Sequence, residues 1–391
     1  MAESVSSFPP TVKAAHDRLS AFAPRAGAAY AHGRNHDLGG IERNHVSALS
    51  PYLKVRLPDE ATIARAVLTQ HDAETADRFL AEVFWRTYWK GWMEMRPAVW
   101  DMYLSDIKWL RDDVQTQSGL RARWEAACNG DTGIAPFDHW ARELARTHYL
   151  HNHARMWFAS IWIFTLKLPW QLGADFFLRH LLDGDAAVNT LSWRWVAGIQ
   201  TRGKTYLADP ANIAQYTGGR FAPPTGLATQ AQEVPYPEAP PAADLPAVDD
   251  APPAGRYGLI LHEDDIVAPP FVAGTPPRAG FSCKRGQLKA HGTWRPRSRP
   301  SDRPSRWMLV RGSTPRTWCG PPKICTAGPW TTGWNPSLCP TPRSDPRGRC
   351  WKTIAPCGMP CRCRNIAARS TARPGRWRPR GSSGSASTSP A

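Results

Sequence analysis

The first 255 residues of this 391-residue chain lack an excess of positive charge, long apolar runs and all but one cysteine. Because Cys128 stands alone in this part, a disulfide scaffold is not expected, and the composition suits the reducing cytoplasm. The longest apolar stretch, Met156 to Leu166, is about half of the ~20 residues that a membrane-spanning helix needs. No charged segment followed by an apolar one opens the chain, so a secretory signal is not expected.

The positive charge of the chain is confined to its last third. Residues 1–255 carry 25 Lys and Arg against 28 Asp and Glu, a net charge of −3, whereas residues 256–391 carry 24 against 5, a net charge of +19. The remaining eight cysteines also lie in this last part. The first 255 residues therefore have no overall electrostatic attraction to DNA, whose backbone is bound mainly by Lys and Arg.

Composition and periodicity divide the chain into four segments. We predict a leader at residues 1–25, a helical domain at 26–222, a Pro- and Ala-rich linker at 223–255, and a low-complexity basic tail at 256–391. A strand is predicted only near 257–265, and from about Pro269 onward neither the helical nor the strand period is present. Two explanations of the tail stay open: a disordered basic segment, or a GC-rich gene read out of frame, which favours Arg, Pro, Gly and Ser codons.

Apolar spacing near 3.6 residues predicts an all-α fold without strands for the helical domain. Pro58, Asp59 and Glu60 suit a first helical turn, and Asp72 suits the N-cap of the next helix. Pro97 ends that second helix. The predicted helices cover residues 12–22, 58–71, 72–95, 137–149, 151–168, 171–182 and 185–199, and residues 30–51 are predicted to form an ordered loop.

An acidic turn comes directly before the last of these helices. Asp183 and Asp185 can accept hydrogen bonds from the N–H groups that a helix start leaves unpaired. On a helix that runs from Asp185, Asn189 and Trp193 share its face, and Trp195 points to another side. If both indoles were only core residues, the acidic turn and the amide would have no explanation, so we predict a binding face.

Three shorter patterns also bring polar and aromatic side chains together. Glu82 and Trp85 share a helix face with Arg86 and Trp89. A carboxylate beside indoles suits a planar heterocycle, and the alternative is an exposed Glu–Arg pair over core aromatics. The second pattern places three side chains on one face of a later helix: Asn152, Arg155 and Met156.

The third pattern is a serine-containing loop. Ser50 before Pro51 predicts an N-cap followed by Pro at the first helical position. Ser47 lies three residues earlier. The two hydroxyl groups at a helix N-terminus predict an anion-binding site.

In this order, the strings WRTYWKGW, HNHARM and DGDAAVNTLSWRW resemble the C-terminal FAD-binding helical domain of the photolyase/cryptochrome family. The resemblance extends from about Tyr30 to Tyr206. It implies that Tyr30, Ser47 and Ser50 hold the FAD pyrophosphate. It also implies that the remaining cofactor residues surround the flavin: Arg155 paired with Asp183 beneath the isoalloxazine, Asp185 lining the bent cofactor, and Asn189 facing flavin N5, where an amide tunes its redox chemistry.

The same resemblance implies an electron-relay chain and a lesion pocket. Trp193 and then Trp170 look like the first two members of the chain that photoreduces the flavin, and the third is open between Trp109 and Trp124. The positions that would receive a flipped-out pyrimidine dimer are Glu82, Trp85, Asn152, Met156 and Trp195. Trp85 and Trp195 would stack on the extruded bases, and Glu82 would hydrogen-bond a base edge and stabilise the radical anion.

The function implied is light-driven electron transfer from reduced FAD that splits pyrimidine dimers in DNA, a deoxyribodipyrimidine photolyase-like carbon–carbon lyase activity. Two alternatives stay open. One is a cryptochrome-like flavoprotein that senses light or redox state without repair, and the other is a non-functional remnant. A dimer pocket at Glu82 favours repair, because a sensor needs the flavin and the relay but no such pocket.

The sequence departs from the family pattern at several places. Ala48 stands where the family has Arg in the serine loop, and Val46 stands where it has Thr, which removes phosphate contacts. An antenna-binding α/β domain is not expected, because only about 25 residues precede the helical domain. A local basic groove remains open as a prediction, formed by Arg86, Lys90, Arg194, Arg202 and Lys204.

No metal site is predicted. On a helix His148 and His151 share a face, whereas His153 lies well round from His151, so the three rings converge poorly. In the tail, Cys357, Cys361 and Cys363 have a spacing that zinc ligands can show, but no matching His pair follows them.

Overall fold

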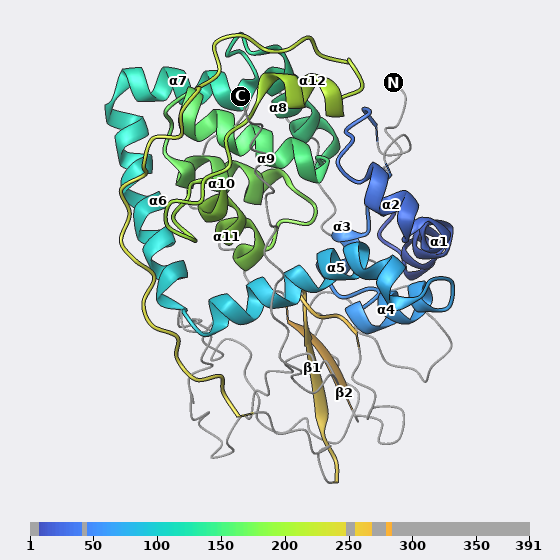
Figure 1. The fold of residues 1–391 in the computed structure, drawn as a ribbon. Coiled ribbons are helices and arrows are strands. Elements are labelled where there is room, and N and C mark those ends of the chain that lie inside the picture. Colours follow the sequence, from blue (N-terminus) through green and yellow to red (C-terminus); the bar gives the residue numbers. More distant parts are fainter. Residues whose placement is uncertain (1–7, 41–44, 248–254, 268–278, 284–391) are drawn as a thin grey trace, which may run out of the picture.

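The computed structural model describes residues 8–40, 45–247, 255–267 and 279–283. Two groups of helices are joined by the long helix α5, which runs between them in Figure 1. The first group is α1 (Val12–Phe22), η1 (Ala23–Arg25), α2 (Ala28–Gly33), α3 (Ser50–Leu53), α4 (Glu60–Leu68) and α5 (Ala73–Glu94). The second is α6 (Ala98–Thr116), α7 (Ser118–Asn129), α8 (Ala135–Thr147), α9 (Asn152–Ser160), η3 (Ile161–Thr165), α10 (Trp170–His180), α11 (Ala186–Val196) and α12 (Pro210–Tyr216).

Side-chain caps set the starts of the early helices. Thr11 accepts a hydrogen bond from the Ala14 amide at 3.1 Å before α1. Asp59 accepts one from the Thr62 amide at 2.8 Å before α4, and Asp72 caps α5 in the same way. Each cap satisfies an N–H group that the helix itself leaves unpaired. The predicted 12–22 helix and the predicted cap at Asp72 are confirmed.

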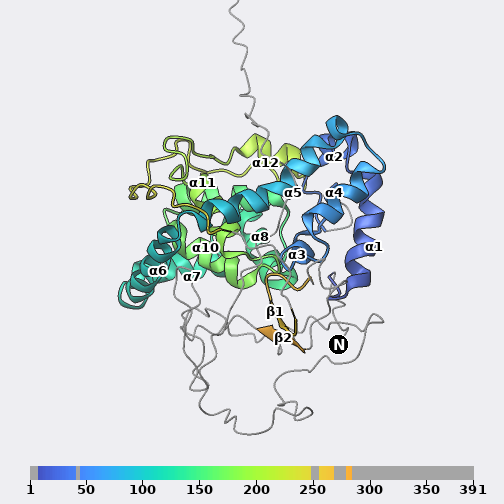
Figure 2. The same cartoon turned by 90° about the horizontal axis from the view of Figure 1, so that it is seen from below.

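Each group of helices has its own apolar core. In the first group, α1–α4 pack on the N-terminal half of α5 around Phe22, Tyr52 and Phe79. In the second, the core is built largely from fully buried rings, among them Trp140, Trp157, Trp162 and Trp193. Seen from below in Figure 2, α6 and α7 lie at one edge of the molecule and α1 at the opposite edge.

Several elements differ from the prediction. No helix was predicted for the residues that form α6 and α7. None was predicted for α12 either, which is capped by Asp209. The predicted loop at 30–51 overlaps the end of α2 and the start of α3. Ser50 as an N-cap is wrong: Leu49 takes the N-cap position of α3, without a side-chain bond, and Ser50 is the first helical residue. A helix of four residues has little dipole, so an anion site there would depend on side chains rather than on the helix N-terminus.

The stretch after α12 is extended and packs on the second helical group. It is the yellow trace that runs along α6 in Figure 1. Leu227, Val234 and Tyr236 pack on the core, and the Ala228 amide donates to Thr165 Oγ1 at 3.0 Å. Residues 223–247 therefore form part of the packed structure, although their composition predicts a linker.

A small parallel sheet follows. β1 (Gly258–His262) pairs with β2 (Ala279–Cys283), Ile260 standing opposite Phe281. β1 confirms the strand predicted near 257–265. β2 lies beyond Pro269, where the sequence shows no strand period. It forms by pairing with β1, so its own sequence does not predict it. Apart from β2, the tail after 267 lies outside the described residues.

None of the helices in the described part of the chain combines the length and the apolar character that crossing a membrane requires.

Candidate functional site

The acidic turn before α11 holds a buried ion pair. Asp183 is buried, and its Oδ2 lies 2.9 Å from Nη2 of Arg155 on α9. Burial alone would raise the pKa of Asp183. The charge of Arg155, its hydrogen bond and a hydrogen bond from the Ser50 hydroxyl outweigh burial and lower that pKa below 3.8. The carboxylate is therefore ionised inside the protein, and it links α9, α3 and the turn.

Asp185 joins the same turn to α5. Its Oδ1 accepts hydrogen bonds from the amides of Ala187 and Val188, both at 3.0 Å, and so caps α11. Its Oδ2 lies 3.1 Å from both Arg86 Nη2 and Lys90 Nζ. These two cations outweigh the cost of burial and lower the pKa of Asp185. The N-cap thus stays charged where the helix dipole favours negative charge.

Asn189 and Trp193 follow on α11, both buried. The Asn189 amide nitrogen donates to the Ala174 carbonyl at 2.8 Å, which leaves the side-chain oxygen as an acceptor. Trp193 packs over Gly173 on α10, where an added Cβ would lie 2.3 Å from the Trp193 ring. Gly173 is one turn after Trp170, so Trp193 sits next to the helix that carries the second predicted relay residue.

Glu82 is held by a residue that the sequence patterns do not single out. Arg34 Nη1 lies 2.6 Å from Glu82 Oε1, and both side chains are partly exposed. The Arg34 guanidinium also stands over the ring of Tyr30, whose pKa is raised chiefly by burial. The sequence signal for Arg34 is its position one helical turn after Tyr30. That signal does not predict the contact with Glu82, because the two residues are 48 positions apart.

The large rings predicted to stack on bases are exposed. Trp85 on α5 is 41% exposed and stacks on Trp89, and Trp195 on α11 is 37% exposed and stacks on Tyr206. Both α5 and α9 contact α11. At the start of α9, Asn152 is exposed and Met156 is half-buried. The five predicted lesion residues therefore stand on three helices that meet at α11.

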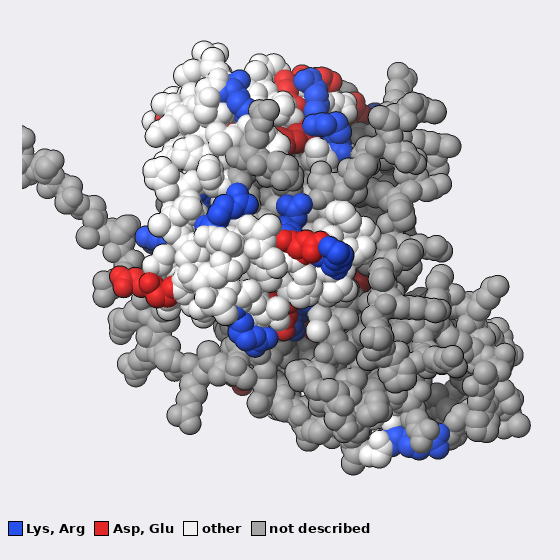
Figure 3. All heavy atoms as spheres, turned by 90° about the vertical axis from the view of Figure 1, so that its right-hand side faces the viewer, with Lys and Arg blue, Asp and Glu red and all other residues white. Residues whose placement is uncertain are grey.

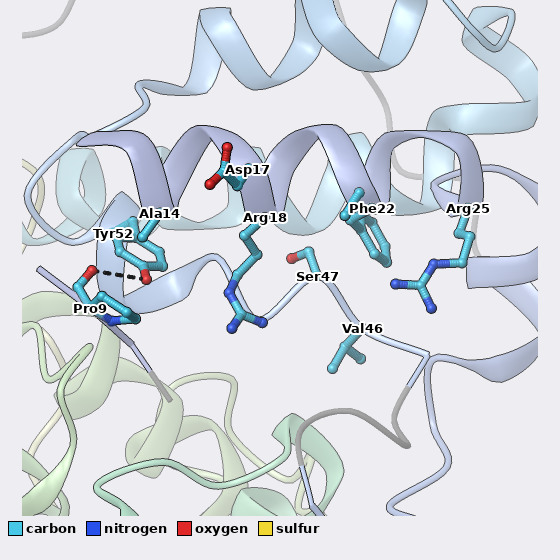
Figure 4. A pocket seen from close by; sticks show the side chains of 10 residues that line it. Pro9, Ala14, Asp17, Arg18, Phe22, Arg25, Val46, Ser47 and Tyr52 are labelled. Carbon is cyan, nitrogen blue, oxygen red and sulfur yellow. Dashed lines mark hydrogen bonds between the residues drawn. The ribbon is translucent and has the colours of Figure 1, made fainter. Parts of the chain in front are cut away.

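A cavity of about 320 Å³ lies between α1 and the serine loop. Figure 4 shows Arg18 and Arg25 reaching from the α1 side toward Ser47 and Val46. Among the described residues on its lining, the acidic side chain is Asp17, which pairs with Lys13 at 2.6 Å. Two guanidinium groups and a hydroxyl give this cavity the chemistry of an anion site.

Arg86 and Arg194 do not contribute to the predicted basic groove, because they are buried, whereas Arg202 and Lys204 are exposed. Lys90 pairs with Asp185. Arg202 pairs with Glu233 and Glu238. On the face drawn in Figure 3, the described basic and acidic side chains are interspersed. Among the described residues named for the groove, Arg86 and Lys90 are therefore held by the buried carboxylate of Asp185, and Arg202 pairs with glutamates at the surface.

The histidines near α9 have structural partners. His151 Nδ1 accepts a hydrogen bond from the His153 amide at 3.2 Å and caps the helix. His153 contacts the Asn35 carbonyl through Nδ1 and the Tyr206 hydroxyl through Nε2. Both rings therefore position α9, the helix that carries Arg155.

Comparison with known proteins supports the resemblance. Residues 79–219 match the model of the FAD binding domain of DNA photolyase. This part of the chain is similar to that domain. This confirms the all-α fold and identifies FAD as the cofactor of the domain. Tyr30, Ser47 and Ser50 precede the matched residues.

The relatives found are photolyases. The deoxyribodipyrimidine photo-lyase of Vibrio cholerae is 29% identical over 195 residues, which are 46% of this chain and 38% of that protein. The one from Streptomyces griseus is 33% identical over 42% of this chain and 34% of its own length. A class III photolyase of Agrobacterium tumefaciens is a structural neighbour with 26% identity and a TM-score of 0.45, covering 54% of this chain and 44% of that one. The chain thus spans little more than a third of the sequence relatives.

The residues present fit a photolyase-type FAD. Asp183 precedes α11 and pairs with Arg155, and Asn189 lies in the first turns of the same helix with its side-chain oxygen left as an acceptor. Such polar groups suit the edge of a flavin. The cationic cavity at Ser47 suits the pyrophosphate, and there Arg18 and Arg25 can supply the positive charge that Ala48 lacks.

Proposed function

We propose that this protein is a FAD-dependent photolyase-like enzyme that splits pyrimidine dimers in DNA by light-driven electron transfer. Bound FAD supplies the light-excited electron donor. The observation that carries the proposal is the ion pair between Arg34 and Glu82 on α5. The same helix carries the exposed ring of Trp85, and it contacts α11, which carries the exposed ring of Trp195. A positioned carboxylate one helical turn from an exposed indole suits an extruded base.

In this proposal the chain divides the work between two sets of residues. The cofactor is held by Tyr30, Ser47, Ser50, Arg155, Asp183, Asp185 and Asn189, with Arg18 and Arg25 at the phosphates. The lesion meets Glu82, Trp85, Asn152, Met156 and Trp195. Arg34 orients Glu82 toward the base edge, and Trp193 and Trp170 carry electrons inward. Cys128, a buried free thiol, supports a cytoplasmic location.

The test begins with the visible spectrum of the purified chain. A yellow or blue protein with flavin bands supports the cofactor assignment, and a colourless protein contradicts it. Illumination with an oligonucleotide that contains a thymine dimer then measures repair. We expect Glu82→Ala and Arg34→Met to lower repair and leave the flavin bands unchanged.

Arg78→Met is the matched control, because Arg78 is an exposed arginine on the same helix as Glu82. It should repair at the wild-type rate. Repair that is undiminished in Glu82→Ala would contradict the role of Glu82.

A second candidate function is light or redox sensing without repair. It is favoured by the ion pairs that Arg86 and Lys90 form with the buried Asp185, because these pairs draw both cations away from a DNA-binding groove. A chain that binds FAD and is photoreduced, but neither prefers nor repairs a thymine dimer, would support sensing. If the chain does not bind FAD, the result would support the alternative that it is a non-functional remnant.

A further inference from the structure

The extended segment after α12 brings a tyrosine to the predicted electron relay. The ring of Tyr236 meets the indole of Trp170 edge-on, with 5.7 Å between ring centres. Its hydroxyl donates to Asp106 Oδ2 on α6 at 2.7 Å. Tyr236 lies outside residues 79–219, the part that matches the family model.

The indoles of the relay are buried without a proton acceptor. Nε1 of Trp193 and Nε1 of Trp170 have no hydrogen-bond partner among the described residues. A second tyrosine, Tyr103, also lies beside Trp170, at 5.8 Å between ring centres. Its buried hydroxyl is likewise unpartnered in the described part of the chain. An oxidised indole at Trp170 therefore keeps its positive charge, and Tyr103 has no base to take its proton.

Unlike Trp170, Trp193 and Tyr103, Tyr236 has a proton acceptor. A group that takes a proton must lie within hydrogen-bond reach, about 2.6–3.2 Å, and Asp106 does. Gln171 donates to the same Asp106 oxygen at 2.9 Å and fixes its orientation. Burial and the neighbouring carboxylate raise the pKa of Tyr236, so the phenol holds its proton in the resting protein.

The buried guanidinium of Arg194 stands 5.1 Å from the centre of the Tyr236 ring. Its positive charge opposes a second positive charge on that ring. The oxidised ring therefore persists only as a neutral radical, which requires that the proton leave.

The two tryptophans predicted as third relay members are Trp109 and Trp124. Trp109 on α6 is 69% exposed, and Trp124 lines a separate cavity with Cys128 and Phe176. The rings that pack on Trp170 in the contacts above are tyrosines.

We propose that Tyr236 is the terminal electron donor of the relay and that Asp106 accepts its phenolic proton. This rests on the proposed flavin photochemistry, in which Trp193 would donate an electron to the bound flavin under illumination and Trp170 would then donate one to Trp193. One electron then passes from Tyr236 to oxidised Trp170. The phenolic O–H bond breaks as an O–H bond forms on Asp106, giving neutral Trp170, a neutral tyrosyl radical and a protonated carboxyl group. A soluble thiol returns the hydrogen atom.

The test is electron paramagnetic resonance of the full chain loaded with oxidised FAD and illuminated. We expect a tyrosyl-radical signal that changes shape when the protein is made with ring-deuterated tyrosine. Tyr236→Phe should abolish the signal. Asp106→Asn should strongly reduce it, because an amide can accept the hydrogen bond but cannot take the proton. Tyr103→Phe, Trp109→Phe and Trp124→Phe are the controls and should retain it.

The outcomes separate this inference from the proposed function. A signal that survives Tyr236→Phe, or one lost in Trp109→Phe or Trp124→Phe, overturns the assignment of Tyr236. A yellow protein with no tyrosyl signal also overturns it and leaves FAD binding and repair standing. A radical signal without dimer repair supports Tyr236 and contradicts repair, and a colourless protein contradicts both. Unchanged flavin absorbance and circular dichroism show that a variant is folded.

Discussion

Asp183 connects the turn before α11 to α9 and α3. Its carboxylate is buried and ionised, Arg155 balances its charge, and the hydroxyl of Ser50 helps to lower its pKa. Such a pair adds little net stability over an apolar pair, but breaking it leaves a buried charge without compensation. The pair therefore acts chiefly to fix geometry at the predicted flavin site.

Arg155→Met should lower the free energy of unfolding by about 3 kcal/mol, because Asp183 remains charged and buried. Adding Asp183→Asn should restore more than half of the loss. Denaturation by urea measures both. Arg142→Met is the control: the Arg142–Asp131 pair is largely exposed, and its loss should cost less than about 1 kcal/mol. Equal losses in the two single variants would contradict the buried-charge argument.

His151 should make stability depend on pH. Burial lowers the pKa of His151 from 6.5 to about 4, and its neutral Nδ1 caps α9. A histidine with a lowered folded pKa stabilises the fold above its unfolded pKa and loses that contribution as the pH falls. Unfolding free energy should therefore drop by about 1–3 kcal/mol between pH 6.5 and 4.

His151→Asn should flatten this dependence, since Asn also caps helices, while His153, whose pKa is also lowered by burial, leaves a residual slope. Urea denaturation at several pH values measures it. An unchanged slope in His151→Asn would assign the effect to other groups.

At the scale of elements, the packing of α11 on α10 depends on a missing side chain. Gly173 lies inside α10, where Ala would normally stabilise a helix by roughly 1 kcal/mol. Here the added methyl would meet the Trp193 ring at 2.3 Å and Trp162 at 3.0 Å, and both rings are buried. The two helices approach closely because position 173 has no Cβ.

Gly173→Ala should therefore destabilise the protein and shift the fluorescence of its tryptophans, with an expected cost of about 1–3 kcal/mol from overpacking. Gly91→Ala is the matched control: Gly91 also lies inside a helix, α5, and a Cβ there meets nothing within 4 Å. That change should stabilise by roughly 0.5–1 kcal/mol. Thermal denaturation compares the two, and a stabilising Gly173→Ala would contradict the close packing.

Local signals predicted the elements that carry their own caps and periods. Asp72 before α5 and Asp185 before α11 are such cases, and both caps are present. In α6 the apolar spacing is interrupted near its end by Arg111 and two aspartates, which weakens the pattern. The pairing of Arg34 with Glu82, and the packing of Tyr236, come from residues far apart in the sequence, so no local pattern predicts them.

At the scale of the molecule, the positive charge and the proposed lesion pocket lie in different parts of the chain. The rings and carboxylate of the proposed lesion pocket lie in residues 1–255, whose net charge is −3, whereas residues 256–391 carry +19. Attraction to the DNA backbone scales with the phosphates that Lys and Arg neutralise, and it weakens as salt rises. Stacking and hydrogen bonding to an extruded base depend on salt much less.

The full chain should therefore bind undamaged duplex with an affinity that falls steeply between about 50 and 200 mM salt. A chain ending at residue 255 should bind the same duplex weakly, with a shallow salt dependence. Both should prefer a thymine-dimer duplex by the same factor, because the proposed pocket is unchanged. Fluorescence anisotropy titrations measure affinity and slope, and circular dichroism checks that the shorter chain is helical. If the shorter chain loses the preference for the dimer, recognition resides in the basic tail and the pocket at Glu82 is wrong.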